Sequence, residues 1–192
     1  MDFSDIWQRA KHGTVSKQEI AAAESALHSS DAGDRHLPLL IIGLARKPEP
    51  SLVDLVRSFL IGGKMEAERY CALRVLCSYW SLWADYLPYV LDKISPEAFD
   101  ADPGVADEAF NLIGTYLWKH PDREAWQRLV AVYDLAREAG NQDLADCAHK
   151  SMFDSLFGKK ELLQREVRHE YRKDDPEVVN AARSKAGLAH QG

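Results

Sequence analysis

The sequence predicts an all-α protein built from helix pairs stacked on one another. Apolar residues recur with a helical period through most of the 192-residue chain, and no useful stretch alternates polar and apolar residues as a strand does. Ala72, Ala109 and Ala148 lie 37 and 39 residues apart, each on the first helix of an expected helix-turn-helix unit. These observations indicate about eight to ten helices, stacked as a solenoid or packed as an irregular helical bundle.

The first two helices are defined by the residues at their ends. A helix over residues 4–12 is ended by Gly13, because glycine readily adopts the left-handed conformation that closes a helix. Ser16 and Glu19 form a capping box, in which the hydroxyl and the carboxylate each accept a backbone N–H. This box predicts a second helix that extends to about residue 28.

Two further helices precede the centre of the chain. Residues 37–44 are almost wholly apolar, and their helix must end before Pro48 because proline cannot continue it. Ser51 and Asp54 repeat the capping-box pattern. They predict a helix over residues 51–61, which a pair of glycines terminates.

The centre of the chain is residues 64–83, KMEAERYCALRVLCSYWSLW. From Tyr70 onward its polar residues Arg74, Ser78 and Ser81 fall on one narrow line of a helix. We therefore expect a single helix that is buried on most of its sides by its neighbours. Its two cysteines are expected to be buried free thiols rather than a disulfide, since the chain begins with no secretory signal.

The second half is predicted to alternate helices and breaks. Asp85 caps a helix to about residue 94, with Pro88 in its first turn, where no intrahelical donor is needed. A short acidic connection then leads to a helix over residues 102–118 with Asp102 as its N-cap.

Proline and glycine mark the remaining boundaries. Helices are expected over residues 122–139 and 142–157, followed by a charged helix over 159–171. We expect residues 1–172 to form a single helical-repeat domain and residues 173–192 to be a polar, partly frayed C-terminal tail.

Two stretches, EAERYCALRVLCSYW at 66–80 and DPGVADEAFNLIGTYL at 102–117, resemble units of the HEAT-repeat superfamily. The resemblance covers residues 34–158. It implies two-helix units of roughly 40 residues that stack into a curved α-solenoid with a concave binding surface. The ladder of Asp and Arg residues typical of the superfamily is incomplete here, so an irregular helical bundle remains the alternative.

Charge is the most informative part of the composition because the net negative charge is concentrated in one segment of the chain. The net charge is −6, and residues 84–110, here called the acidic window, hold seven acidic residues against Lys93 alone. The segments before and after the window are each balanced to zero. Such a field attracts cationic surfaces and repels phosphates, so it favours a basic protein over nucleic acid as the partner.

Aromatic residues lie within and beside the acidic window. Tyr and Trp rings lose little rotamer entropy on binding and accept Lys or Arg over the ring face, so they are suited to anchor a cationic partner. The predicted contacts are Asp85, Asp92, Asp100, Asp102, Asp107 and Glu108, with Trp83, Tyr86 and Tyr89 as aromatic anchors.

A small acidic helical chain of this kind is similar in character to bacterial immunity proteins, which neutralise toxin domains. Many such toxins are nucleases with cationic clefts. The resemblance implies a cytoplasmic inhibitor that is a monomer or a small homo-oligomer. The alternative is a HEAT-like scaffold or regulatory subunit that docks onto a larger complex through its apolar ends, with the acidic window serving solubility alone.

The sequence favours neither an enzyme nor a metal protein. Glu166 with His169, and Asp146 with His149, have the spacing of carboxylate–histidine ligand pairs in di-iron bundles, but no further inward carboxylate is singled out to complete a site. The seven histidines are scattered, and no metalloprotease, C-x-x-C or nucleophile-elbow motif is present. We therefore expect no catalytic residue, no cofactor and no metal.

Nucleic acid and membrane are also disfavoured as partners. The cationic cluster over residues 159–173 is interleaved with glutamates, so it makes a weak patch for phosphates. No apolar stretch reaches the roughly 20 residues that a membrane span needs.

Overall fold

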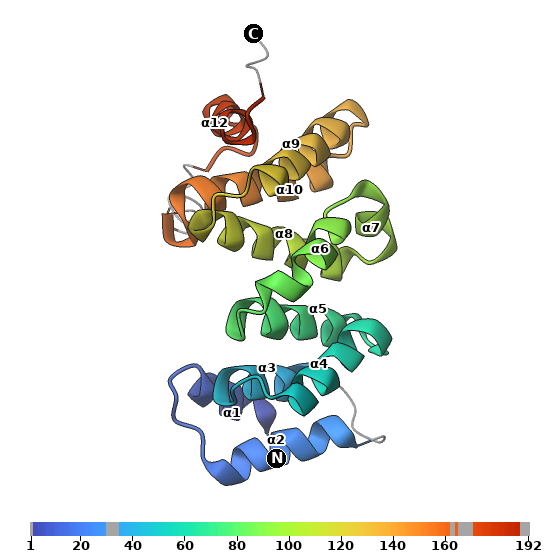
Figure 1. The fold of residues 1–192 in the computed structure, drawn as a ribbon, viewed down its shortest axis with the longest axis vertical. Coiled ribbons are helices and arrows are strands. Elements are labelled where there is room, and N and C mark those ends of the chain that lie inside the picture. The colour runs from blue at the N-terminus through green and yellow to red at the C-terminus, as the bar shows by residue number, and fades with distance from the viewer. Residues whose placement is uncertain (1, 30–34, 162–163, 165–170, 189–192) are drawn as a thin grey trace. The chain divides into compact units, whose positions relative to one another are not determined.

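The structure is a computed structural model that describes residues 2–29, 35–161, 164 and 171–188. These residues form eleven α-helices, whose bounds are given below, and one π-helical turn; residues 159–161 and 164 are also helical, and none of the described residues lies in a strand. The all-α prediction is confirmed. Contacts between residues group the chain into two compact units, Met1–Leu87 and Pro88–Gly192 (Figure 1).

The first unit is organised around α3 (His36–Ala45). This helix packs against α1 (Phe3–Ala10), α2 (Lys17–His28), α5 (Glu66–Arg74) and the π-helical turn η1 (Val75–Tyr79), while α4 (Pro50–Gly62) packs against α5 and η1. Its apolar sequence explains this position, since Leu39, Ile41 and Ile42 are fully buried.

Capping differs between the helices of the first unit. Ser16 and Glu19 form the predicted capping box at the start of α2, so that prediction is confirmed. The second box is wrong, because α4 begins at Pro50 and Glu49 is its N-cap. The fixed φ of proline suits the first helical position, which places Ser51 inside the first turn.

The predicted continuous helix over residues 64–83 is also wrong. The chain leaves α-helical geometry after Arg74, makes η1, and then breaks at Ser81, whose φ is +57°. The indole N–H of Trp80 donates to the backbone carbonyl of Arg46 at 3.0 Å, which ties the break to the end of α3. The predicted burial of this segment is confirmed at Cys71 and Cys77, which lie in the core. Neither cysteine forms a disulfide, as predicted.

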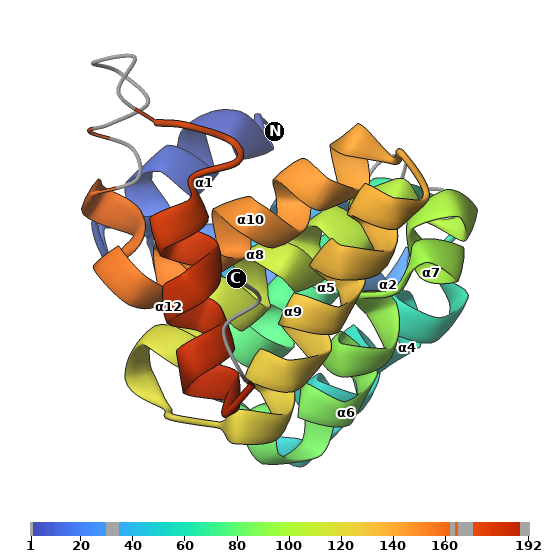
Figure 2. The ribbon, with the colours of Figure 1, turned by 90° about the horizontal axis from the view of Figure 1, so that it is seen from above.

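The second unit packs its long helices side by side. α10 (Gln142–Phe157) lies against both α8 (Pro103–Lys119) and α9 (Arg123–Glu138), and α12 (Pro176–Ala186) covers α9 and α10 (Figure 2). Its core is apolar; the largest fully buried side chains are Ile94, Phe110, Ile113, Leu129, Leu144, Met152 and Phe153.

The acidic window holds one more helix than predicted. α6 (Trp83–Lys93) begins two residues before Asp85, so Pro88 lies inside the helix rather than in its first turn. The expected acidic connection is itself helical, because Ser95 accepts the backbone N–H of Ala98 at 3.1 Å and so caps α7 (Pro96–Ala101). Asp102 occupies the N-cap position of α8, as predicted, but its side chain makes no capping hydrogen bond.

The structure also differs from the frayed tail expected beyond residue 172. Asp175 caps α12, and Val178, Val179, Ala182 and Ala186 are buried in the second unit. These side chains are small, so the apolar stripe is inconspicuous in the sequence. The charged helix predicted over residues 159–171 falls mostly outside the described residues.

Candidate protein-binding surface

The acidic window extends over the boundary between the two units. Asp85 is exposed and Trp83 is half-buried in the first unit. Asp102 is half-buried in the second unit. Four carboxylates of the window are exposed there: Asp92, Glu97, Asp100 and Asp107.

Two of the predicted contacts have side chains that are buried in the structure. Glu108 is only 4% exposed, since it lies on the face of α8 that carries Val105 and Leu112 into the core. Tyr86 is 9% exposed, and this burial raises the pKa of its hydroxyl, an effect opposed by the charge of Arg57. Neither side chain is placed to meet a partner.

The single cation of the window is already engaged on its own helix. Lys93 Nζ lies 3.1 Å from Asp92 Oδ2, and it sits 5.1 Å from the ring centre of Tyr89. Tyr89, a predicted anchor for a partner's cation, thus already accepts one from this chain.

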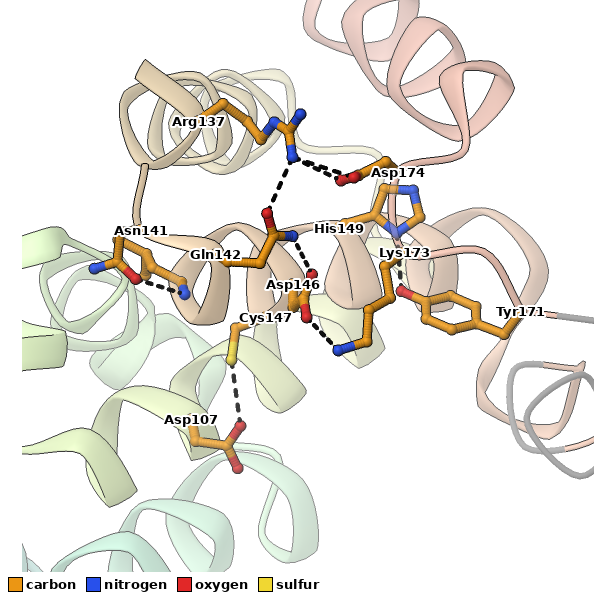
Figure 3. Close-up of polar contacts among 11 residues, drawn as sticks. Asp107, Arg137, Asn141, Gln142, Asp146, Cys147, His149, Tyr171, Lys173 and Asp174 are labelled. Atoms are coloured by element: carbon orange, nitrogen blue, oxygen red, sulfur yellow. Dashed lines mark hydrogen bonds and ion pairs between the residues drawn. The ribbon is translucent and has the colours of Figure 1, made fainter. Parts of the chain in front are cut away.

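Carboxylates from α8 and α10 converge around Cys147. The thiol lies 3.8 Å from Asp107 Oδ1 (Figure 3). Asp143 and Asp146 are close enough to act on it electrostatically. Burial first, and then these three negative charges, raise the pKa of Cys147 to about 11. The thiol is therefore protonated at neutral pH and is not a nucleophile.

The sequence reasoning missed Asp143, which is exposed at the start of α10. A signal for this region was present, because Asp107 and Asp146 are separated by the same 39 residues as Ala109 and Ala148. Nine carboxylates are exposed in the described part of the second unit, and Glu124, Glu138, Asp174 and Glu177 lie outside the window and away from Cys147 in the chain. The other five are here called the acidic surface: Asp92, Glu97, Asp100, Asp107 and Asp143.

Next to the acidic surface, other charges are paired within the chain. Arg137 Nη1 lies 3.1 Å from Asp174 Oδ2 and donates to Gln142 at 3.2 Å, and Gln142 donates to Asp146 at 2.8 Å (Figure 3). Asp146 is also ion-paired with Lys173. These contacts fasten the segment before α12 onto α9 and α10.

His149 and Asp146 do not act as the ligand pair that their spacing allows. His149 is fully buried, and its Nδ1 lies 2.8 Å from the Tyr171 hydroxyl. Burial lowers the pKa of His149, an effect opposed by the backbone carbonyl of Asp175 and by nearby carboxylates. Within the described ranges, no group of three or more His, Cys, Asp or Glu side chains is placed to hold a metal ion.

Two other sequence features fall partly or wholly outside the described residues. Glu166 and His169 of the second ligand-like pair lie there, as do Arg165 and Arg168 of the cationic cluster. In the described part of the chain, no helix is both long and apolar enough to cross a membrane.

No family model, curated protein or solved structure was found to match this chain at a significant level.

Proposed function

We propose that this chain is a non-enzymatic protein-binding module whose acidic surface engages a basic protein. In this proposal it acts as bacterial immunity proteins do, in the cytoplasm, by covering a cationic toxin domain such as a nuclease. The observation that supports the proposal is that the five carboxylates of the acidic surface are exposed, while residues 84–110 hold Lys93 as their single cation.

The surroundings of these carboxylates leave most of their charge available. Asp107 accepts from the uncharged Asn111 amide at 3.3 Å and faces the protonated thiol of Cys147. Asp92 has Lys93 as a partner, but its side chain is 71% exposed and such a surface pair is weak. Exposed charge of one sign accelerates the encounter with an oppositely charged partner.

The proposal includes stacked helix pairs of the HEAT-like kind. In the second unit, Ala109 of α8 and Ala148 of α10 are both fully buried, and the two helices pack against each other. Small residues at matching positions allow neighbouring helices of a stack to approach closely. Asp107 and Asp146 have the same 39-residue separation as these two alanines, so in this proposal they occupy matching positions of successive helix pairs.

Association kinetics with a defined partner test this function. The partner is the basic protein encoded beside the gene for this chain, because a toxin and its antidote are normally encoded together. Reversing Asp92 and Asp100 together to Lys is expected to slow association roughly tenfold or more at low ionic strength. The wild-type rate should fall steeply as salt is added, and that of the variant should not.

A matched control carries the same change of net charge in the first unit. Asp5 and Asp54 are both exposed, and reversing them to Lys should leave most of the association rate intact. Equal slowing by both double variants would show that only net charge matters. Unchanged binding by the Asp92 and Asp100 variant would place the contact elsewhere, and a neighbouring product that fails to bind would contradict the immunity role.

A scaffold that docks through apolar residues is the second candidate. Ile61 is 77% exposed and Met65 is 43% exposed, and they flank the two glycines between α4 and α5. Exposed apolar residues this close together favour a protein contact. Light scattering after size-exclusion chromatography tests it: self-association that Ile61→Asp abolishes would favour docking, and a monomer unaffected by Ile61→Asp would disfavour it.

A further inference from the structure

A hollow of about 240 Å³ opens in the second unit where four helices end or begin. Leu117 and Trp118 line it from α8, Trp126 from α9, Leu156 from α10 and Lys185 from α12. The walls are thus aromatic and aliphatic, with one cation at the edge. This volume is below the usual range for drug-sized ligands, so it suits a molecule of one or two fused rings.

The two indoles of the hollow are available for a ligand. Trp118 is 53% exposed, unusual for so large an apolar side chain, and its ring is backed by Gly158, where an added Cβ would lie 3.5 Å from it. Trp126 is only 3% exposed, and it lines the hollow from the first turns of α9.

Two of the residues that line the hollow are polar, Lys185 and Ser155, and Lys185 contributes a positive charge. The hydroxyl of Ser155 already donates to the carbonyl of Ser151 at 2.7 Å, so its proton is in use. A positive charge beside aromatic walls matches a flat ring that carries a negatively charged acceptor.

We propose that this hollow is a binding site for a small aromatic carboxylate. The ring lies between the indoles and the Leu side chains, and the carboxylate meets Lys185. The site involves neither the acidic surface nor the proposed basic partner, and it stands or falls independently of both.

Nuclear magnetic resonance of the indole N–H groups of the full chain tests the site. The protein has five tryptophans, and Trp118→Phe and Trp126→Phe assign the two relevant signals. Addition of 2-naphthoate at neutral pH should shift these two signals saturably and leave the other three in place. The expected dissociation constant is about 1 mM or tighter for a ligand of this size.

Charge is tested with one variant and one uncharged probe. Lys185→Gln should weaken naphthoate binding about two- to fivefold, whereas Lys47→Gln, an exposed lysine of the first unit, should not. The neutral 2-naphthalenemethanol should bind the wild type more weakly than naphthoate does, and bind both lysine variants as it binds the wild type.

Several results would overturn the proposal. Absence of saturable shifts within the solubility of naphthoate would remove the site, and shifts at other tryptophans would place binding elsewhere. Equal affinity for the acid and the alcohol would show that the carboxylate is not recognised. The hollow would then be an apolar contact site, such as one for a partner's side chain. Folding of Lys185→Gln is judged from its own unliganded indole spectrum.

Discussion

Cys147 reports the local potential at the edge of the acidic surface. Burial and the carboxylates of Asp107, Asp146 and Asp143 raise the pKa of its thiol to about 11, so alkylation by iodoacetamide near pH 8 should be slow. Replacing Asp107 with Asn removes the nearest charge and lowers that pKa, so the alkylation rate should rise severalfold. Mass spectrometry of the peptide carrying Cys147 measures the rate.

The control for this change is a carboxylate that does not act on the thiol. Asp54→Asn alters an exposed side chain of the first unit and should leave the alkylation rate of Cys147 unchanged. A rate that Asp107→Asn fails to raise would mean that burial alone protects the thiol, and that the carboxylates around it contribute little negative potential.

His149 makes the stability of the protein depend on pH near neutrality. Burial lowers its pKa in the folded state below the value of about 6.5 that it has in an unfolded chain. The unfolded state therefore binds more protons as pH falls through that value, and the free energy of unfolding should fall with it. Urea unfolding at about pH 7.5 and about pH 5.5 measures the difference in the free energy of unfolding. Both pH values lie above the range in which most carboxylates titrate, so their titration contributes little to the difference.

His149→Gln should flatten this dependence, whatever it does to stability at the higher pH. The Tyr171 hydroxyl and the Asp175 carbonyl face the imidazole, and the carboxylates of Asp174 and Asp146 act on it from nearby. Replacing the exposed His12 with Gln should leave the dependence intact. A slope that survives in the His149 variant would assign the titration to another group.

At the scale of elements, η1 packs closely against α3 because residue 43 of α3 is glycine and has no side chain. A Cβ on Gly43 of α3 would lie 2.6 Å from a methyl group of Val75 and 2.7 Å from the Tyr79 ring. Both of these residues belong to η1. A π-helical turn brings side chains to positions that an α-helix does not reach, and here α3 accommodates them only because residue 43 is glycine.

Gly43→Ala should therefore destabilise the protein although alanine is the better helix former. Overpacking of this kind costs about 1 to 3 kcal/mol and the gain in helix propensity is about 1 kcal/mol, so a net loss of up to about 2 kcal/mol is expected. Gly62→Ala is the control, because no atom lies within 4 Å of its added Cβ. It should stabilise the protein by up to about 1 kcal/mol in urea unfolding, and equal effects of the two variants would contradict the close packing.

The same packing shows which elements the sequence could predict. Helix ends with local signals, such as the Ser16 capping box and the Asp102 N-cap, appear where expected, since they depend on residues within one turn. The break at Ser81 could not be predicted, because it depends on Gly43 and on the Trp80 contact with Arg46, more than thirty residues away in the chain. α12 was missed because its buried side chains are mostly Ala and Val.

At the scale of the whole molecule, the charge imbalance could be read from the sequence but the position of each charge could not. Asp107 and Glu108 are neighbours in the chain, yet one is exposed and the other is 4% exposed, because successive residues of a helix face different directions. Asp143 joins the acidic surface through the packing of α10 on α8, which a count along the chain does not include.

Carboxylates kept for a partner should be ones that the fold itself does not need. Replacing Asp100 and Asp107 together with Asn removes repulsion among like charges, so the free energy of unfolding should rise by about 0.5 kcal/mol at low salt. The gain should shrink as salt screens the remaining charges. Asp54→Asn gives the opposite sign, because it removes the ion pair with Arg57 at 2.7 Å, a surface pair worth less than about 1 kcal/mol. If the double variant instead loses stability as Asp54→Asn does, the acidic surface supports the fold, and its exposed charge no longer argues for a binding role.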